Sequence, residues 1–142
     1  MMERYRLSFC NAIKLDDDLA EFIVDEGVEL NLALVDEYHA WIVAHLQRPY
    51  LLLVHKVNAY HYDFASQTAM GTLLGIKAAA FVVYTHISQL TTQVMLSMPR
   101  DADWVYRIFN NRDDALMWLG MQRESNDHDG KTLKSTSKSL IR

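Results

Sequence analysis

Residues 50–57, Tyr-Leu-Leu-Leu-Val-His-Lys-Val, form the stretch around which this chain is organised. They make a short, almost unbroken apolar run, preceded by Arg48 and Pro49 and followed by polar and turn-forming residues from Asn58 onward. A run of this length between turn signals is typical of a strand buried on both faces of a parallel sheet. We therefore predict a central parallel strand here and expect the rest of the chain to pack around it.

Two further strands are predicted after it. Residues 78–84, Ala-Ala-Ala-Phe-Val-Val-Tyr, are a second continuous apolar run, bounded by Lys77 and Thr85. The three small alanines indicate that a helix packs closely on this strand. Residues 105–109 are predicted as the last strand.

One helix is predicted before the central strand in the sequence and another after it. The first has Asn31 as its N-cap and runs to about Gln47, because apolar residues recur there every three to four positions. The second covers residues 64–74, with Asp63 as its N-cap and Gly75 as its stop. The residues of this second helix that we expect to face the core are Ala69, Met70, Leu73 and Leu74.

Two more helices follow the second apolar run. Apolar residues recur at helical spacing in the third helix, which Pro99 closes; they are Ile87, Leu90, Val94 and Met98. The fourth helix is predicted to begin at Asn110, with Asp113 completing a capping-box-like start, and to end at Gly120.

An antiparallel hairpin is predicted at the N-terminus. Apolar residues alternate with polar ones from Tyr5 to Ile13, which predicts one half-buried strand. Three aspartates at 16–18 then form a turn into a second strand at 19–24, and a short edge strand is predicted at 28–30. A calcium site is the alternative interpretation of the aspartates, but the spacing of an EF-hand loop, with its Gly and distal Glu, is absent.

The order of elements predicts an α/β fold in a single small domain. A mixed β-sheet would carry the antiparallel hairpin at one end and parallel β-α repeats at the other, with helices packed on the sheet. The chain has 142 residues, half of them apolar, which suits one domain rather than two. We assign residues 1–121 to this domain and predict a disordered, solvated tail over 122–142, where the apolar pattern fades.

Composition excludes several classes of function. The formal net charge is −4, and this acidic balance argues against a nucleic-acid partner. Cys10 is the only cysteine, which rules out an intramolecular disulfide and a Cys-rich metal site. No apolar stretch approaches the roughly 20 residues of a membrane span, and no signal peptide is recognisable, so we expect a cytoplasmic protein.

Three stretches resemble one family. They are the central run with its extension to Tyr60, the strand 78–84, and above all the ending at 107–119, Arg-Ile-Phe-Asn-Asn-Arg-Asp-Asp-Ala-Leu-Met-Trp-Leu. Together they are similar to the SpoIIAA-like (STAS-like) family of bacterial proteins, over residues 19–120. The resemblance implies a mixed sheet with helices packed against it, and its motifs are mostly structural.

The resemblance also points to the loop after the central strand. In the anti-sigma-factor antagonists of this superfamily that loop carries a phosphoacceptor motif, Asp-Ser-Ser-Gly, at the start of the next helix. Asp63 is present here, but Phe64 stands where the serine is expected, and only the offset Ser66 could replace it. The departure puts a phosphorylation switch in doubt.

Enzymatic chemistry has little support in the sequence. His61, Asp63 and Ser66 are the only local grouping with the residue types of nucleophilic catalysis. Capping of the next helix by Asp63 explains the grouping without a reaction, so we expect no enzyme. His39 and His45 are six residues apart and lack the i, i+4 spacing of a zinc helix, so we predict neither a metal site nor a cofactor.

The expected function is therefore binding. An aromatic cluster would lie at the carboxyl end of the buried strand, where ligands bind open α/β sheets. The predicted partner- or ligand-binding residues are Asn58, Tyr60, His61, Tyr62, Asp63 and Phe64. The leading hypothesis is a non-catalytic regulatory module that binds an unidentified protein. The alternative is a domain that binds an apolar small molecule or lipid, since some relatives carry a combined STAS/SEC14 label. The sequence leaves open whether the chain pairs with a second copy of itself.

Overall fold

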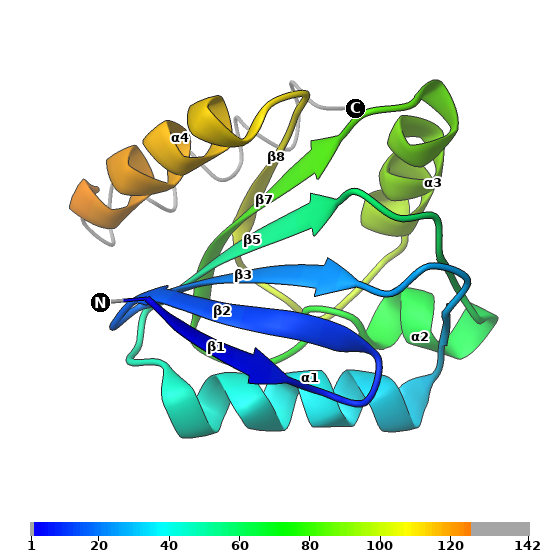
Figure 1. Ribbon diagram of the computed structural model, residues 1–142, viewed down its shortest axis with the longest axis horizontal. Helices are drawn as coiled ribbons and strands as arrows, with labels where there is room; N and C mark the ends of the chain where they lie inside the picture. The colour runs from blue at the N-terminus through cyan, green and yellow to red at the C-terminus, as the bar shows by residue number, and fades with distance from the viewer. Residues whose placement is uncertain (1, 126–142) are drawn as a thin grey trace.

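The central feature of the structure is a six-stranded mixed sheet (Figure 1). The structure is a computed structural model, and it describes residues 2–125. β5 (Tyr50–Lys56) pairs in parallel with β3 (Leu19–Val24) on one side and β7 (Ile76–Val83) on the other, and β8 (Val105–Phe109) continues the parallel part. The full order is β1-β2-β3-β5-β7-β8. The predicted α/β fold in a single small domain is confirmed.

The antiparallel end of the sheet has three strands instead of the predicted two. β1 (Glu3–Arg6) and β2 (Cys10–Asp16) pair antiparallel with each other, and β2 pairs antiparallel with β3. The single strand predicted from Tyr5 to Ile13 is wrong, because the chain reverses between Leu7 and Cys10, where the Leu7 N–H donates to the Cys10 carbonyl at 2.9 Å. Leu7 and Phe9 lie in this turn and are both buried, which is why the apolar alternation continues through it.

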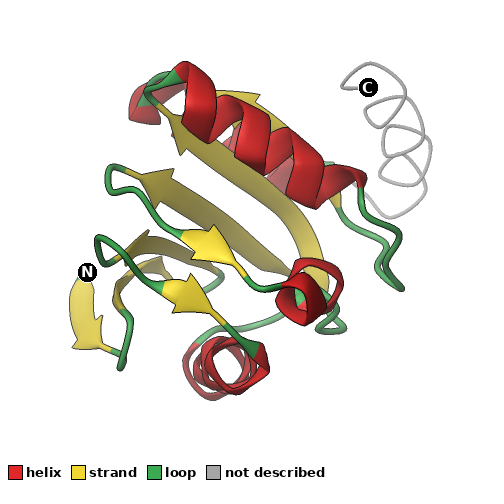
Figure 2. Cartoon of the chain, turned by 90° about the vertical axis from the view of Figure 1, so that its right-hand side faces the viewer, coloured by secondary structure: helices red, strands yellow, loops and turns green. Residues whose placement is uncertain are grey.

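Helices cover both faces of the sheet (Figure 1). α1 (Leu32–His45) and α3 (His86–Ser97) contribute to the core on one face, with Trp41, Ile42 and Met95 among their buried residues. α4 (Arg112–Glu124) packs on the opposite face through Trp118 and Leu119. Figure 2 shows β4 (Glu29–Leu30) beside β6 (His61–Tyr62), which form a separate two-stranded parallel sheet before α2 (Phe64–Ala69).

The central strand is buried on both faces, as predicted. Leu52 faces the core under α1 and α3, whereas Leu51 and Leu53 face the core under α4. Each of these leucines is at most 2% exposed, and complete burial of such a side chain contributes about 2 kcal/mol. The alanines of β7 divide in the same way, with Ala79 on the first face and Ala78 and Ala80 on the second.

Two of the predicted helix starts are confirmed by their caps. The Asn31 side chain accepts a hydrogen bond from the Leu34 N–H, and the Asp63 side chain accepts one from the Ser66 N–H. The cap of α4 is Asn111, one residue after the predicted Asn110, and it accepts from the Asp114 N–H.

Two predicted helix ends are wrong. α2 stops at Ala69, so that Leu74 is 75% exposed instead of lying in the core, while Met70 and Leu73 are partly buried. The α4 helix continues through Gly120 to Glu124, because a glycine in a helix is tolerated where its neighbours pack. The first residues of the predicted tail are therefore helical, and residues 126–142 lie outside the described part.

The apolar pattern of α3 faces outward. Thr92, Met95 and Leu96 are its buried residues, whereas the apolar residues that predicted the helix are largely exposed: Ile87, Leu90 and Val94. Among the helices of residues 2–125, none combines the length and hydropathy that crossing a bilayer requires.

Candidate functional site

The loop from Asn58 to Tyr60 lies at the carboxyl edge of the parallel strands and is held by the preceding β3–β4 turn. The Asn58 amide donates to the Val24 carbonyl at 2.9 Å. The Ala59 N–H donates to a Glu26 carboxylate oxygen at 3.1 Å, and its carbonyl accepts from the Gly27 N–H at 2.7 Å. These bonds hold the loop in place at the carboxyl edge of the sheet.

Tyr60 and Tyr62 point inward from this loop and β6. Their rings meet edge to face with centroids 5.8 Å apart, and both pack against the core. Burial raises the pKa of the Tyr60 phenol well above its usual value, and the neighbouring Tyr62 phenol adds to the shift. The Lys56 ammonium lies 5.1 Å from the Tyr60 ring centre and 5.3 Å from that of Tyr62, and it donates to the Thr92 hydroxyl at 2.7 Å. The two rings therefore help to solvate a buried lysine by cation–π contact.

The other predicted site residues point elsewhere. Phe64 is 80% exposed at the start of α2. The His61 ring lies 3.5 Å from the exposed Glu29 carboxylate, and Asp63 caps α2. The fully buried Ser66 hydroxyl donates to the Leu30 carbonyl at 2.9 Å, so phosphorylation would require this contact to open.

The different burial of Tyr62 and Phe64 can be measured through the free energy of unfolding. We expect Tyr62→Ala to lower the free energy of unfolding by about 3 kcal/mol, because it removes a ring packed on the core. Phe64→Ala should change it by less than about 0.5 kcal/mol, because the ring is exposed. Urea denaturation of both variants compares the two values, and equal losses would contradict the inward placement of Tyr62.

A groove lies between this loop and the first half of α3. The hollow has a volume of about 300 Å³, and its walls include predicted residues of the loop as well as residues of α3. The lining residues that bear on its chemistry are Glu26, Lys56, Val57, Asn58, Tyr60, Tyr84 and Ile87. Val57, Tyr84 and Ile87 are more than half exposed, so the rim of the groove is largely apolar.

The outer side of α3 extends this apolar surface. Ile87, Leu90 and Val94 are 72%, 46% and 54% exposed, at the spacing that places them along one side of a helix. The helix His-Ile-Ser-Gln-Leu-Thr-Thr-Gln-Val-Met-Leu-Ser contains no Asp, Glu, Lys or Arg. We call Ile87, Leu90 and Val94 the α3 face. A solvated helix with several large apolar side chains and no charge is typical of a surface that contacts another molecule.

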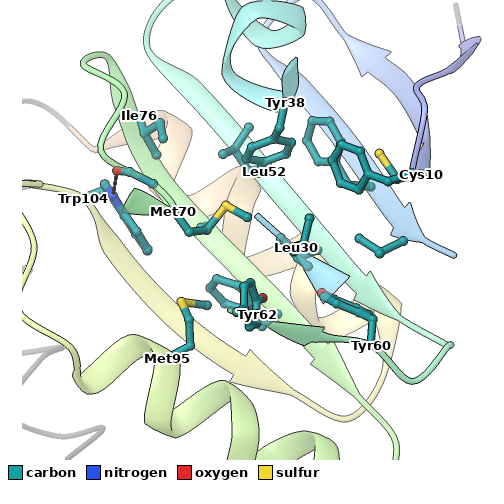
Figure 3. Close-up of a pocket in the computed structure, with 17 residues that line it drawn as sticks. Cys10, Leu30, Tyr38, Leu52, Tyr60, Tyr62, Met70, Ile76, Met95 and Trp104 are labelled. Atoms are coloured by element: carbon teal, nitrogen blue, oxygen red, sulfur yellow. Dashed lines mark hydrogen bonds between the residues drawn. The ribbon is translucent and has the colours of Figure 1, made fainter. Parts of the chain in front are cut away.

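A separate apolar cavity lies inside the core beneath α1 and β6. Figure 3 shows Tyr60, Tyr62, Met70, Met95 and Trp104 around it, with the Trp104 indole donating to the Gly71 carbonyl at 2.7 Å. The cavity has a volume of about 30 Å³, enough for about one or two waters.

The cavity wall also includes the single cysteine. Cys10 is completely buried, and burial raises the pKa of its thiol to about 12. A thiol that stays protonated at neutral pH is a weak nucleophile, so Cys10 acts as a small apolar wall residue.

One side-chain network was missed by the sequence analysis. On the face covered by α4, the Glu21 carboxylate accepts from the Arg112 guanidinium at 2.9 Å and contacts His55 Nδ1 at 2.7 Å. His55 Nε2 lies 2.7 Å from the Tyr84 hydroxyl. Glu21 is only 3% exposed, and a carboxylate inside an otherwise apolar strand was the signal that could have drawn attention to it.

The charge state of Glu21 follows from its partners. Burial by itself would raise the pKa of Glu21, but the hydrogen bonds from Arg112 and His55 outweigh it, so the pKa is lowered. The residue is therefore a carboxylate at neutral pH, and its negative charge is balanced by Arg112.

Comparison of the chain with models of protein families, with curated proteins and with solved structures finds no match. Within residues 2–125, no three His, Cys, Asp or Glu side chains come together as a metal ion would require.

Proposed function

We propose that this chain is a non-catalytic, SpoIIAA-like regulatory module of the cytoplasm that binds a protein partner through the α3 face and the adjoining groove. The observation that carries the proposal is the α3 face itself, an uncharged helix surface with three exposed apolar side chains. The order of strands and helices supports the resemblance to STAS-like domains, since it has the mixed sheet that the resemblance implies.

The chemistry of the surface favours a protein segment with apolar side chains. Burying a large apolar side chain contributes about 1.5–3 kcal/mol, so three of them can offset part of the entropy lost on association. Docking on the α3 face would bury no Asp, Glu, Lys or Arg of this helix, which avoids a desolvation penalty there. The groove beside Ile87 can receive one side chain of the partner, and Asn58 and Tyr60 from the predicted site loop line it.

Binding is tested by a charge placed in the α3 face. Leu90→Glu should abolish recovery of a stoichiometric protein companion when the tagged chain is purified from its native cell, because the carboxylate would be buried without a partner. Met117→Glu is the matched control, since Met117 is 68% exposed on α4, on the other face of the sheet. Equal recovery with Leu90→Glu and Met117→Glu would overturn the proposal.

Ligand binding is the second candidate, and the internal cavity supports it. The flexible side chains of Met70 and Met95 form part of its wall and could make room for an apolar molecule larger than the cavity in its present form. Native mass spectrometry of the purified chain distinguishes the candidates, since a bound small molecule favours this one and a protein companion favours the first.

A further inference from the structure

The network of Glu21, His55 and Tyr84 has the connectivity of a nucleophile, a base and an orienting carboxylate. Glu21 lies in β3 and His55 in β5, and Tyr84 directly follows β7. A carboxylate can only accept hydrogen bonds, so His55 Nδ1 donates to Glu21. In a neutral imidazole Nε2 is then the acceptor, and it faces the Tyr84 hydroxyl at 2.7 Å. The ring is therefore held in the tautomer that can take a proton from Tyr84.

The position of Tyr84 makes the outer end of this network accessible to a molecule in the groove. Tyr84 is 53% exposed, whereas Glu21 and the His55 side chain are 3% and 13% exposed. Tyr84 also forms part of the groove wall, together with Val57 and Ile87. The inner end of the network is thus buried while its outer end meets the solvent beside an apolar hollow.

We propose that Tyr84 is a nucleophile toward activated carboxylic esters with small apolar acyl groups, with His55 as its general base and Glu21 as the residue that positions His55. The apolar rim of the groove would accept the acyl group. An uncharged electrophile suits the site better than an anionic phosphoryl donor, because the positive charge of Arg112 is already neutralised by Glu21. In addition, two aspartates, Asp113 and Asp114, lie in the first turn of α4 and would repel an anion.

The step conserves atoms and charge. Tyr84 Oη attacks the carbonyl carbon of the ester, and its proton passes to His55 Nε2. The tetrahedral intermediate then expels the phenol of the activated ester, which leaves more readily than the Tyr84 oxygen and takes the proton from Nε2. The product is an aryl ester that stays on Tyr84. The reaction is therefore a stoichiometric covalent modification without turnover, which agrees with a non-catalytic module and does not depend on partner binding.

The test uses 4-nitrophenyl acetate and the full chain. Peptide mass spectrometry follows acetylation with time at Tyr84 and at Tyr5. The Tyr5 hydroxyl donates to the Glu3 carboxylate at 2.6 Å instead of to an imidazole, and the Tyr5 ring packs beside that of His45, with centroids 4.4 Å apart. We expect Tyr84 to react about 100-fold faster than Tyr5, the contribution typical of a positioned general base. A Tyr84 rate equal to that of Tyr5 would overturn the proposal without any variant.

The variant His55→Gln tests whether His55 acts as a general base or only supports the structure. Glutamine can bond to both Glu21 and Tyr84 but cannot accept the proton, so the rate at Tyr84 should fall to that at Tyr5, while circular dichroism shows a retained fold. An unchanged rate at Tyr84 in folded His55→Gln would also overturn the proposal. If this variant does not fold, the ratio of Tyr84 to Tyr5 in the natural chain decides alone.

Discussion

Gly71→Ala is expected to lower the free energy of unfolding by about 3 kcal/mol, from backbone strain and steric overlap together. The φ angle of Gly71 is +82°, a conformation that side chains with a Cβ rarely adopt. A Cβ at this position would lie 2.5 Å from Cζ2 of Trp104, whose indole is bonded to the Gly71 carbonyl. The ring has little freedom to move because it is buried in the cavity wall.

Gly27→Ala is the matched control for this change. Gly27 has a similar φ of +78°, but nothing lies within 4 Å of the position of its Cβ. The control should therefore show the strain alone, about 1 kcal/mol. Urea denaturation at neutral pH measures both variants, and equal losses would contradict the close approach of Trp104.

Arg112→Ala is expected to lower the free energy of unfolding by about 3 kcal/mol at pH 7, because Glu21 would keep its buried charge with only His55 as partner. His55 and Arg112 are the groups that face the Glu21 carboxylate, from β5 and α4. Without Arg112, only His55 would oppose the effect of burial, which raises the pKa of Glu21.

The effect of Arg112→Ala depends on pH with a definite sign. The pKa of Glu21 is lowered in the native chain, so its contribution to stability is fully present above the ordinary value of 4.5 and is lost as pH falls through the lowered native pKa. The difference in unfolding free energy between the natural chain and Arg112→Ala should therefore shrink from pH 7 to pH 3. Denaturant titrations across this range measure it, and a constant difference would contradict the ionic character of the pair.

The sequence predicted the parts of the fold that depend on neighbouring residues. The apolar run at 50–57 and the caps at Asn31 and Asp63 are local signals, and the structure confirms them. The turn at Leu7 and Phe9 was missed because both side chains are buried there, so the alternation of a strand continued across a reversal. The end of α4 was misplaced because Gly120 is a stop signal only where the helix is not held by packing.

The binding role of the candidate site stays a prediction, and the structure shows only where its side chains lie. Residues at the carboxyl edge of the sheet do line a groove, and Asn58 and Tyr60 belong to it. The direction of each side chain could not be predicted, so Tyr62 and Phe64, two residues apart, were grouped although one packs on the core and the other is exposed.

Residue patterns by themselves determined that this chain forms parallel β-α repeats after antiparallel strands, because burial on both faces requires an unbroken apolar run. Only the tertiary structure decided which polar residues meet. Glu21 and Arg112 are 91 positions apart, and they pair because α4 crosses the sheet face on which β3 presents its carboxylate. The outward direction of the α3 face was decided in the same way, since the helix packs through Thr92, Met95 and Leu96 and leaves its more regular apolar row to the solvent.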